Sequence, residues 1–520
     1  MPLVDMKLVP DGQPLSPVST KEGRKPTARQ GSDGVSSSKP RKEIHTTIWL
    51  LLVELCEKFT FFGIVCNMIL FCTIKLGYPN HQAATINLCF VGACMVTPLL
   101  MGWLAQCLVE RSTLAYICAF LHFVGTALLP VVAFPFEDFF IDKHYVLHTL
   151  ARREQQVLFY VGLSATCLGS GGIRAIVCPL SVYDLDAYRE KELLSFFNWF
   201  YWLENLSSAI VLVIISYIQQ SVAKNLGFLI PFVSVLMALI TIHMARSEMI
   251  YQPPKGNGLL TVCGVVANAL RVCCVKCRYF SGDVTNWLDH AKENYGGQYS
   301  ETQVESTKLL VRLFPFIAFQ ILYRICVVQI PSGYYLQAMN SNLNLNGFLL
   351  PVAAMNVISI LPFLILAPVL ECLNTCLFSP ETSGRFPAVC IGSFITYKFV
   401  PGRIRGVALQ ALTFFNGAGC IMEALLVQAA YTTSQGDWFP NILNEGKLER
   451  FYFFLASLMM INTLGFWTIS HRYTNLQQDY DKGFRGSLLQ EQLLQHEKSL
   501  IFYDSILDCP SPLSPVETLL

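Results

Sequence analysis

The feature that most constrains this chain is a succession of apolar segments, each close to the roughly 20 residues that a membrane-spanning helix needs. We expect about ten spanning helices, six in the first half of the chain and four in the second. The first contains residues 54–63, and the others are Leu88–Leu104, Leu114–Phe134, Val157–Pro179, Phe196–Tyr217, Phe228–Met244, Leu309–Ile330, Phe348–Leu370, Val407–Ala430 and Tyr452–Ile469. A chain with so many segments of this length is expected to lie in a lipid bilayer.

The composition agrees with an integral membrane protein. Of the 520 residues, 53% are hydrophobic and only 14% are charged, which is more apolar than an average soluble domain. The net charge of +1 at pH 7 gives no reason to expect a nucleic acid as partner. We therefore predict an all-α polytopic membrane protein whose surroundings are the lipid bilayer.

Polar stretches divide the chain into five parts. The predicted parts are a disordered N-terminal tail (1–44), a six-helix bundle (45–245), a linker (246–307), a second helical bundle (308–470) and a C-terminal tail (471–520). Lys and Arg are in excess in the first part, which predicts a cytoplasmic N-terminus. An even number of spans then places the linker and the C-terminus in the cytoplasm as well. The pattern fits a plasma membrane and an endolysosomal membrane equally.

Three ionisable residues, Glu54, Glu57 and Lys58, lie inside the first apolar segment. Each costs about 2.5 to 3.5 kcal/mol at the centre of a spanning helix, so all three are expected to face protein or water. They share one helix face, because they are three and four residues apart. They can form a structural ion pair with each other or with a neighbouring helix. Because two carboxylates face one ammonium group, they can also form a proton-binding site, and we favour this functional interpretation.

The sequence contains none of the common catalytic motifs. His-Glu-x-x-His, Gly-x-Ser-x-Gly, the P-loop and Gly-x-Gly-x-x-Gly are all missing from the printed sequence. We therefore predict that the protein is not an enzyme, and we expect neither a metal nor a cofactor.

Two segments of the chain follow recognisable motifs. Glu54–Gly63 reads Glu-Leu-Cys-Glu-Lys-Phe-Thr-Phe-Phe-Gly, and Gly169–Arg174 reads Gly-Ser-Gly-Gly-Ile-Arg. The first resembles Glu-x-x-Glu-Arg-Phe-x-Tyr-Tyr-Gly and the second Gly-x-Gly-Gly-x-Lys on the fourth helix of the proton-coupled oligopeptide transporters, the POT/PTR family of the major facilitator superfamily. Phe196–Asn205 is similar to Phe-Phe-x-x-Phe-Tyr-x-x-Ile-Asn on the fifth helix. Shorter matches occur at Pro98, Gly102–Ala105, Gln329, Gln337–Ala338, Asn356, Pro368, Phe399–Pro401, Arg405–Gly406 and Phe415–Gly417. Within the family, the chain resembles solute carrier family 15.

The resemblance implies two six-helix bundles that rock around a site at the membrane midplane, with protons driving di- and tripeptides inward. Carried over by position, Glu54, Glu57 and Lys58 would form the proton-coupling cluster. Arg174 would bind the peptide's carboxylate and Asn356 its backbone, although an ordinary interhelical hydrogen bond explains Asn356 equally well. Further positions that would line the substrate cavity are Phe61, Phe62, Asn205 and Gln329.

The chain also departs from the family pattern. Lys58 replaces an arginine, Phe61 and Phe62 replace two tyrosines, and Leu88 stands where animal members carry a proton-linked histidine. The largest departure lies between residues 377 and 401, where the family would place a ninth and most of a tenth helix. The apolar run there is short and interrupted, so the second bundle is expected to lack about two helices.

Two further functions therefore remain open beside proton-coupled peptide symport. The lost tyrosines and helices would permit a transport-inactive relative that acts as a sensor or binds a partner protein. A carrier of smaller zwitterions, such as histidine and other amino acids, would need fewer contacts than a peptide carrier. The expected ligands are accordingly protons together with small peptides or peptide-like zwitterions.

Overall fold

The computed structural model describes residues 39–133, 151–176, 190–222, 228–244, 258–276, 286–312, 314–376, 402–441 and 445–468. The chain divides into two units, Met1–His45 and Thr46–Leu520. Of the first unit, only the opening turns of helix α1 are described. The second unit contains all the other described helices, and the following paragraphs concern it alone.

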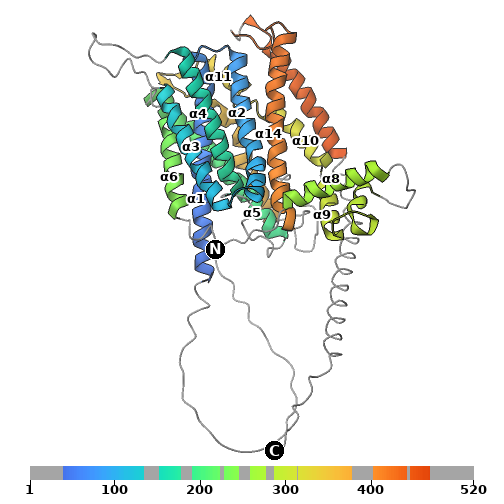
Figure 1. Cartoon of the computed structure of the whole chain (residues 1–520). Coiled ribbons are helices and arrows are strands. Elements are labelled where there is room, and N and C mark those ends of the chain that lie inside the picture. Colours follow the sequence, from blue (N-terminus) through green and yellow to red (C-terminus); the bar gives the residue numbers. More distant parts are fainter. Residues whose placement is uncertain are drawn as a thin grey trace, which may run out of the picture. The chain divides into compact units, whose positions relative to one another are not determined.

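The first half of the chain forms six long helices, which run mostly parallel or antiparallel to one another (Figure 1). They are α1 (Lys39–Ile74), α2 (Asn80–Cys107), α3 (Arg111–Ala133), α4 (Arg152–Ile176), α5 (Glu190–Ile210) and α6 (Leu229–Met244). After α5 the helix widens into two π-helical stretches, η3 (Val211–Ile215) and η4 (Ile218–Val222). Pro98 lies inside α2 and Pro130 inside α3. Proline is tolerated within membrane-spanning helices more readily than within helices of soluble proteins.

The second half begins with a helix that lies crosswise to the others (Figure 1). This is α8 (Gly258–Lys276), and the short 3-10 helices η6 (Trp287–Ala291) and η7 (Glu293–Tyr295) follow it. The remaining helices are α9 (Glu301–Arg312), α10 (Phe314–Val327), α11 (Gly333–Met339), the 3-10 helix η8 (Val352–Asn356), α12 (Val357–Cys376), α14 (Gly402–Thr433) and a last helix, Leu448–Thr468.

The prediction of an all-helical membrane fold is confirmed, with two differences in detail. Nine helices in the described part of the chain are long and apolar enough to cross a membrane, because α6 has only 16 residues. The segment 377–401, where about two helices were predicted to be missing, lies outside the described residues.

The second difference concerns the start of the predicted span Phe348–Leu370. Phe348 belongs to a small hairpin of two strands, β1 (Asn344–Leu345) and β2 (Phe348–Leu349). Asn346 and Gly347 connect the strands and both have positive φ, the arrangement that an Asn-Gly hairpin turn requires. The candidate span therefore starts only after this hairpin, at Val352, where the 3-10 helix η8 leads into α12.

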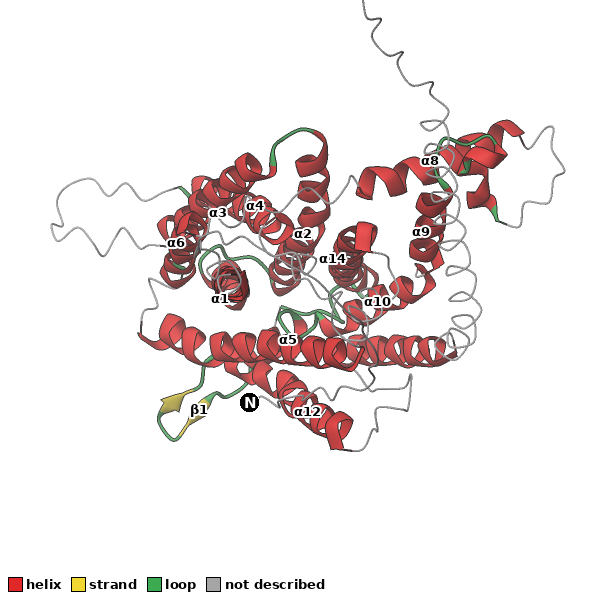
Figure 2. Ribbon diagram, turned by 90° about the horizontal axis from the view of Figure 1, so that it is seen from below, coloured by secondary structure: helices red, strands yellow, loops and turns green. Residues whose placement is uncertain are grey.

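Small residues allow the helices of the first half to pack closely. Gly125 on α3 and Gly162 on α4 face each other, and a Cβ atom on either would come within 3.3 Å of atoms of the opposite helix. A Cβ atom on Gly169 would meet the backbone of His122 in the same way. Such glycines bring helix backbones together in membranes, where van der Waals packing drives association. Figure 2 shows α3 and α4 side by side, next to α2 and α6.

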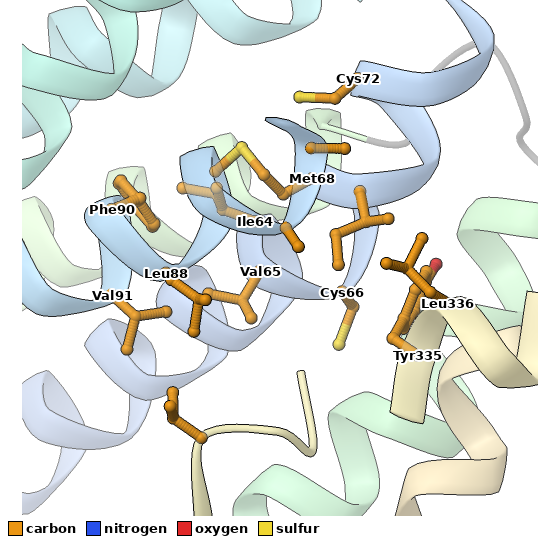
Figure 3. Packing of buried hydrophobic residues seen from close by; sticks show 14 of the residues in the cluster. Ile64, Val65, Cys66, Met68, Cys72, Leu88, Phe90, Val91, Tyr335 and Leu336 are labelled. Carbon is orange, nitrogen blue, oxygen red and sulfur yellow. The ribbon is translucent and has the colours of Figure 1, made fainter. Parts of the chain in front are cut away.

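The two halves of the chain meet along two pairs of helices. The helix α2 packs lengthwise against α14, and Gly92 lies directly on the backbone of Gly417. The helix α5 packs against α12. Buried apolar residues of α1, α2 and α11 belong to one core cluster, including Ile64, Met68, Leu88, Phe90, Tyr335 and Leu336 (Figure 3).

The helix α8, the 3-10 helix η6 and the helix α9 form a small unit with its own charged core. Lys292 lies 3.1 Å from Asp289, 2.9 Å from Glu301 and 2.7 Å from Glu305. Lys308 binds Asp289 at 2.6 Å and Glu305 at 2.7 Å. Burial alone would raise the pKa of Asp289, but the hydrogen bonds from Lys308 and Lys292 outweigh it and hold this pKa below its usual value.

Candidate functional site

An ion pair buried in the first half of the chain is the centre of the candidate site. The Glu57 side chain on α1 is 2% exposed, and its Oε2 accepts a hydrogen bond of 2.8 Å from Nε of Arg174 on α4. The hydroxyl of Ser170, one helical turn before Arg174, donates to Oε1 of the same carboxylate. Each oxygen of Glu57 therefore has its own donor, which a buried carboxylate needs in order to keep its charge.

The guanidinium group of Arg174 is only partly used by this pair. Its Nη2 atom is buried and has no hydrogen-bond partner in the described part of the chain. The ring of Phe61 lies beneath the guanidinium, with the Arg174 Cζ atom 4.7 Å from the ring centroid. Arg174 is thus held by Glu57 on one edge and by an aromatic face below. The free Nη2 can donate to a further acceptor.

A second ion pair joins α1 to α5. The Lys58 Nζ atom lies 2.6 Å from Oε1 of Glu204, and both side chains are partly exposed. The sequence allowed Lys58 to pair with Glu54 or with a neighbouring helix, and in the structure its ion-pair partner lies on the neighbouring helix α5. Glu54 is close enough to interact electrostatically with Lys58, Glu204, Glu57 and Arg174. The structure therefore brings the four charged residues predicted on α1 and α4 into one cluster.

The predicted residues of the second half lie elsewhere. Asn356 is 3% exposed at the end of η8, and Gln329, which is 1% exposed, donates through Nε2 to Oε1 of Glu423 on α14. In the described residues, no hydrogen bond or ion pair joins Asn356 or Gln329 to the Glu57–Arg174 pair. The sequence therefore predicted site residues in both halves of the chain. In the structure, Asn356 and Gln329 lie apart from the charged cluster around Glu57 and Arg174.

Of the other residues predicted to line the cavity, Phe61 lies in the cluster around Arg174, whereas Asn205 is bonded within its own helix. Phe61 is buried against Phe90 of α2, and Phe62 contacts it edge to face. Asn205 bonds the backbone oxygen of Tyr201 on its own helix at 2.8 Å. Phe61 thus belongs to the Arg174 cluster, whereas the amide nitrogen of Asn205 is engaged within α5.

Polar contacts tie the two halves together at opposite ends of the helices. The Trp202 Nε1 atom donates to the Leu364 carbonyl at 3.0 Å, and Asn198 donates to Glu371 at 3.2 Å, both between α5 and α12. At the other end, Gln428 Nε2 of α14 donates to Thr85 of α2 at 2.8 Å.

Two buried titratable residues near these clusters were missed by the sequence reasoning. Glu423 is 0% exposed on α14, and His122 is 1% exposed on α3, close enough to Glu57 and Arg174 to interact with them electrostatically. Neither ring nitrogen of His122 has a hydrogen-bond partner in the described part of the chain. A lone acid within the apolar run Val407–Ala430 is itself a sequence signal, because charged groups inside spanning helices are costly.

The fold defines a polytopic membrane protein, and the comparisons with known proteins identify its family. Residues 112–379, more than half of the chain, match the family model PTR2, described as POT family. The chain therefore belongs to the POT family, and it is an integral multi-pass membrane protein rather than an enzyme.

Individual relatives agree with this assignment. The chain is 49% identical to human solute carrier family 15 member 5 over 547 aligned positions, which cover 93% of this chain and 94% of the relative. The resemblance to solute carrier family 15 is thereby confirmed. The Arabidopsis thaliana protein NRT1/PTR family 8.5 is 26% identical, with 85% and 92% of the two chains covered.

Solved structures show the same fold at lower identity. The POT family transporter PepTSo superposes with a TM-score of 0.57 and 17% identity, covering 83% of this chain and 98% of PepTSo. An auto-inhibited POT family peptide transporter gives a TM-score of 0.56 and 17% identity, with 82% and 97% covered. The POT and major facilitator fold is therefore shown.

Proposed function

We propose that this chain is a proton-coupled symporter that carries di- and tripeptides, or peptide-like solutes, across a membrane. Protons would bind the acidic cluster of α1, and the carboxylate of the substrate would bind Arg174. Asn356, Phe62, Asn205 and Gln329 remain proposed substrate contacts. The N- and C-termini are proposed to lie in the cytoplasm.

The observation that carries this proposal is the half-used guanidinium of Arg174. Its Nε atom donates to Glu57, while its buried Nη2 has no partner among the described residues. An unpaired buried donor is costly unless a ligand satisfies it. A carboxylate suits this place, because the planar guanidinium can bind both carboxylate oxygens. Protonation of Glu57 would weaken its hold on Arg174 and leave the guanidinium free for the substrate.

The names of similar structures support a peptide-like substrate. One of them, with a TM-score of 0.54 and 14% identity, is a peptide transporter POT in complex with alafosfalin. Another is described as a bacterial homologue of the human drug peptide transporters PepT1 and PepT2, with a TM-score of 0.51. These descriptions apply to those proteins, and together with Arg174 they make a zwitterionic peptide the first substrate to test.

The proposal is tested by uptake of a labelled dipeptide set, and of histidine, into cells that express the full chain. We expect uptake to rise when the external medium is acidified and to be abolished by Glu57→Gln. The matched control is Glu449→Gln, the same change at an exposed acid on the helix Leu448–Thr468. Uptake is normalised to the amount of folded protein at the cell surface.

Two results would contradict the proposal. Uptake that does not respond to pH would remove the proton from the mechanism. No uptake of any tested solute, by this chain and by a version with the corresponding human segment inserted between residues 377 and 401, would favour a transport-inactive sensor. Uptake of histidine alone would favour the amino-acid carrier.

A further inference from the structure

The second half of the chain contains a buried acid that the proposed mechanism does not use. Glu423 lies within α14, inside the candidate span Gly406–Thr433, and its side chain is 0% exposed. Glu423 lies in the other half of the chain from Glu57, and it is not among the site residues predicted from the sequence. A carboxyl group in such a place needs an explanation, because burying it without compensation is costly.

The immediate neighbour of Glu423 is a neutral amide. Gln329 donates from Nε2 to Oε1 of Glu423, and both side chains are buried. Within the described residues, no Lys, Arg or His nitrogen lies within 4.0 Å of the Glu423 carboxyl group. Its Oε2 atom and the Oε1 atom of Gln329 are both buried and both without a hydrogen-bond partner there.

The surrounding helices do not supply a compensating cation. The nearest arginine on α10 is Arg324, but its guanidinium is directed to the sulfur atoms of Cys420 at 3.5 Å and of Met95 at 3.6 Å. The helix α2 contains no Asp, Glu, Lys or Arg residue. The other titratable groups on the described parts of these helices are Tyr323 and Cys326 on α10, Tyr334 and Tyr335 on α11, His81, Cys89, Cys94 and Cys107 on α2, Cys420 and Tyr431 on α14, and Glu449, Arg450 and Tyr452 on the last helix.

One added proton would satisfy both unpaired atoms. A carboxylic acid protonated at Oε2 can donate to the amide oxygen of Gln329, while the amide nitrogen of Gln329 donates to Oε1. The two groups would then form a cyclic acid–amide pair with two hydrogen bonds. An ionised carboxylate offers only acceptors, so it would leave Oε2 and the Gln329 oxygen unpaired in a low-dielectric interior.

We propose that Glu423 is a proton-binding site in the second half of the chain, which holds its proton in an acid–amide pair with Gln329 in this conformation. Release of the proton requires water, and none can reach a fully buried side chain until the packing around α14 changes. Because α14 packs lengthwise on α2 of the first half, movement of the halves is a means of opening the site. Its use in transport rests on the proposed function, whereas the protonated state does not.

The test is infrared difference spectroscopy on the full chain, purified and reconstituted in lipid at neutral pH. A protonated carboxylic acid has a C=O stretching band that an ionised carboxylate lacks, and the band shifts when H₂O is replaced by D₂O. We expect Glu423→Gln to remove one such band. Glu449→Gln, the same change at an exposed acid, is expected to remove none, and so is Glu57→Gln, which changes an ion-paired acid.

A second variant tests the pairing and does not depend on the folding of the first. Gln329→Leu removes the amide but keeps Glu423, so we expect the same band to remain and to move to higher frequency as the acid loses its partner. The proposal is overturned if wild type and Glu423→Gln have identical bands in this region. It is equally overturned if the band does not respond to Gln329→Leu.

These spectra separate the proton site from the transport proposal. A chain that shows the Glu423 band but takes up no peptide keeps the proton site and loses the proposed function. A chain that transports dipeptides but lacks the band keeps the function and overturns the proton site.

Discussion

Glu57 and Glu423 are two glutamates that are almost completely buried, one in each half of the chain, and their surroundings differ in kind. Glu57 has a guanidinium partner at 2.8 Å and a hydroxyl donor, so both of its oxygens are satisfied. Glu423 has a single amide donor, and one of its oxygens is without a partner in the described structure. Similar burial thus goes with a paired charge in one half and an unpaired acid in the other.

The difference shows that burial by itself does not decide what an intramembrane acid does. A carboxylate beside a cation can stay ionised, and its removal leaves the cation uncompensated. A carboxyl group beside a neutral amide is more stable with a proton, and replacement by a neutral amide changes little. Substitution experiments should therefore separate the two residues clearly.

The largest expected effect is that of Glu57→Gln on stability. Arg174 would lose its charged partner in a buried site, which costs about 3 to 5 kcal/mol. Thermal unfolding of the purified chain in lipid measures this loss. The double variant Glu57→Gln with Arg174→Gln should recover part of it, because the uncompensated charge is gone. Equal losses in the single and double variants would contradict a charge pair.

An intermediate effect is expected for Asp289, a buried acid outside the spanning helices. Asp289→Asn removes a carboxylate that binds Lys308 at 2.6 Å and Lys292 at 3.1 Å, and hydrogen bonds to charged groups contribute about 1.5 to 3 kcal/mol. Hydrogen exchange of the α8–α9 unit measures the loss. The reduced protection should be confined to this unit.

The pH dependence of the same unit follows from the lowered pKa of Asp289. A carboxyl group whose pKa is depressed on folding stabilises the folded form above its unfolded pKa, and this contribution is lost as pH falls through the folded value. Protection of α8–α9 should therefore fall below about pH 4 in the wild type. In Asp289→Asn this acid-dependent loss should be reduced; an unchanged acid profile would contradict the role of Asp289.

The smallest expected effect is that of Glu423→Gln on stability. An amide can make the same two hydrogen bonds to Gln329 as a protonated acid, so the free energy of unfolding should change by less than about 1 kcal/mol. Thermal unfolding of the Glu423→Gln and Glu57→Gln variants, measured under the same conditions in lipid, compares the two losses of stability directly. A large loss would indicate that Glu423 is ionised and paired, and the contrast between the two glutamates would disappear.

Much of the fold could be predicted from the sequence, because apolar length alone identifies spanning helices. The limit of that rule appears at Phe348, because the Asn346–Gly347 turn places the first residues of the predicted span in a hairpin. The division into five parts and the missing helices near residues 377–401 stay predictions. The 547 aligned positions exceed the 520 residues of this chain, so the human relative has positions without a counterpart here.

The candidate site could be predicted only in part. Motif resemblance located Glu57 and Arg174, and spacing placed Glu54, Glu57 and Lys58 on one helix face. The partner of Lys58 could not be predicted, because Glu204 lies on α5, far away in sequence. Gln329 was named without its partner, since only packing brings Glu423 of α14 beside it. Local sequence therefore indicated which groups are costly to bury, and tertiary packing decided how each is compensated.

The most direct test of the transport site is competition binding to the purified full chain. A labelled dipeptide is displaced by the unlabelled dipeptide or by its C-terminal amide, which lacks the carboxylate. If Arg174 binds that carboxylate, the amide should compete about 10 to 100 times more weakly, as a charge-assisted hydrogen bond predicts. This difference should vanish in Arg174→Gln. Equal competition by dipeptide and amide in the wild type would contradict the account.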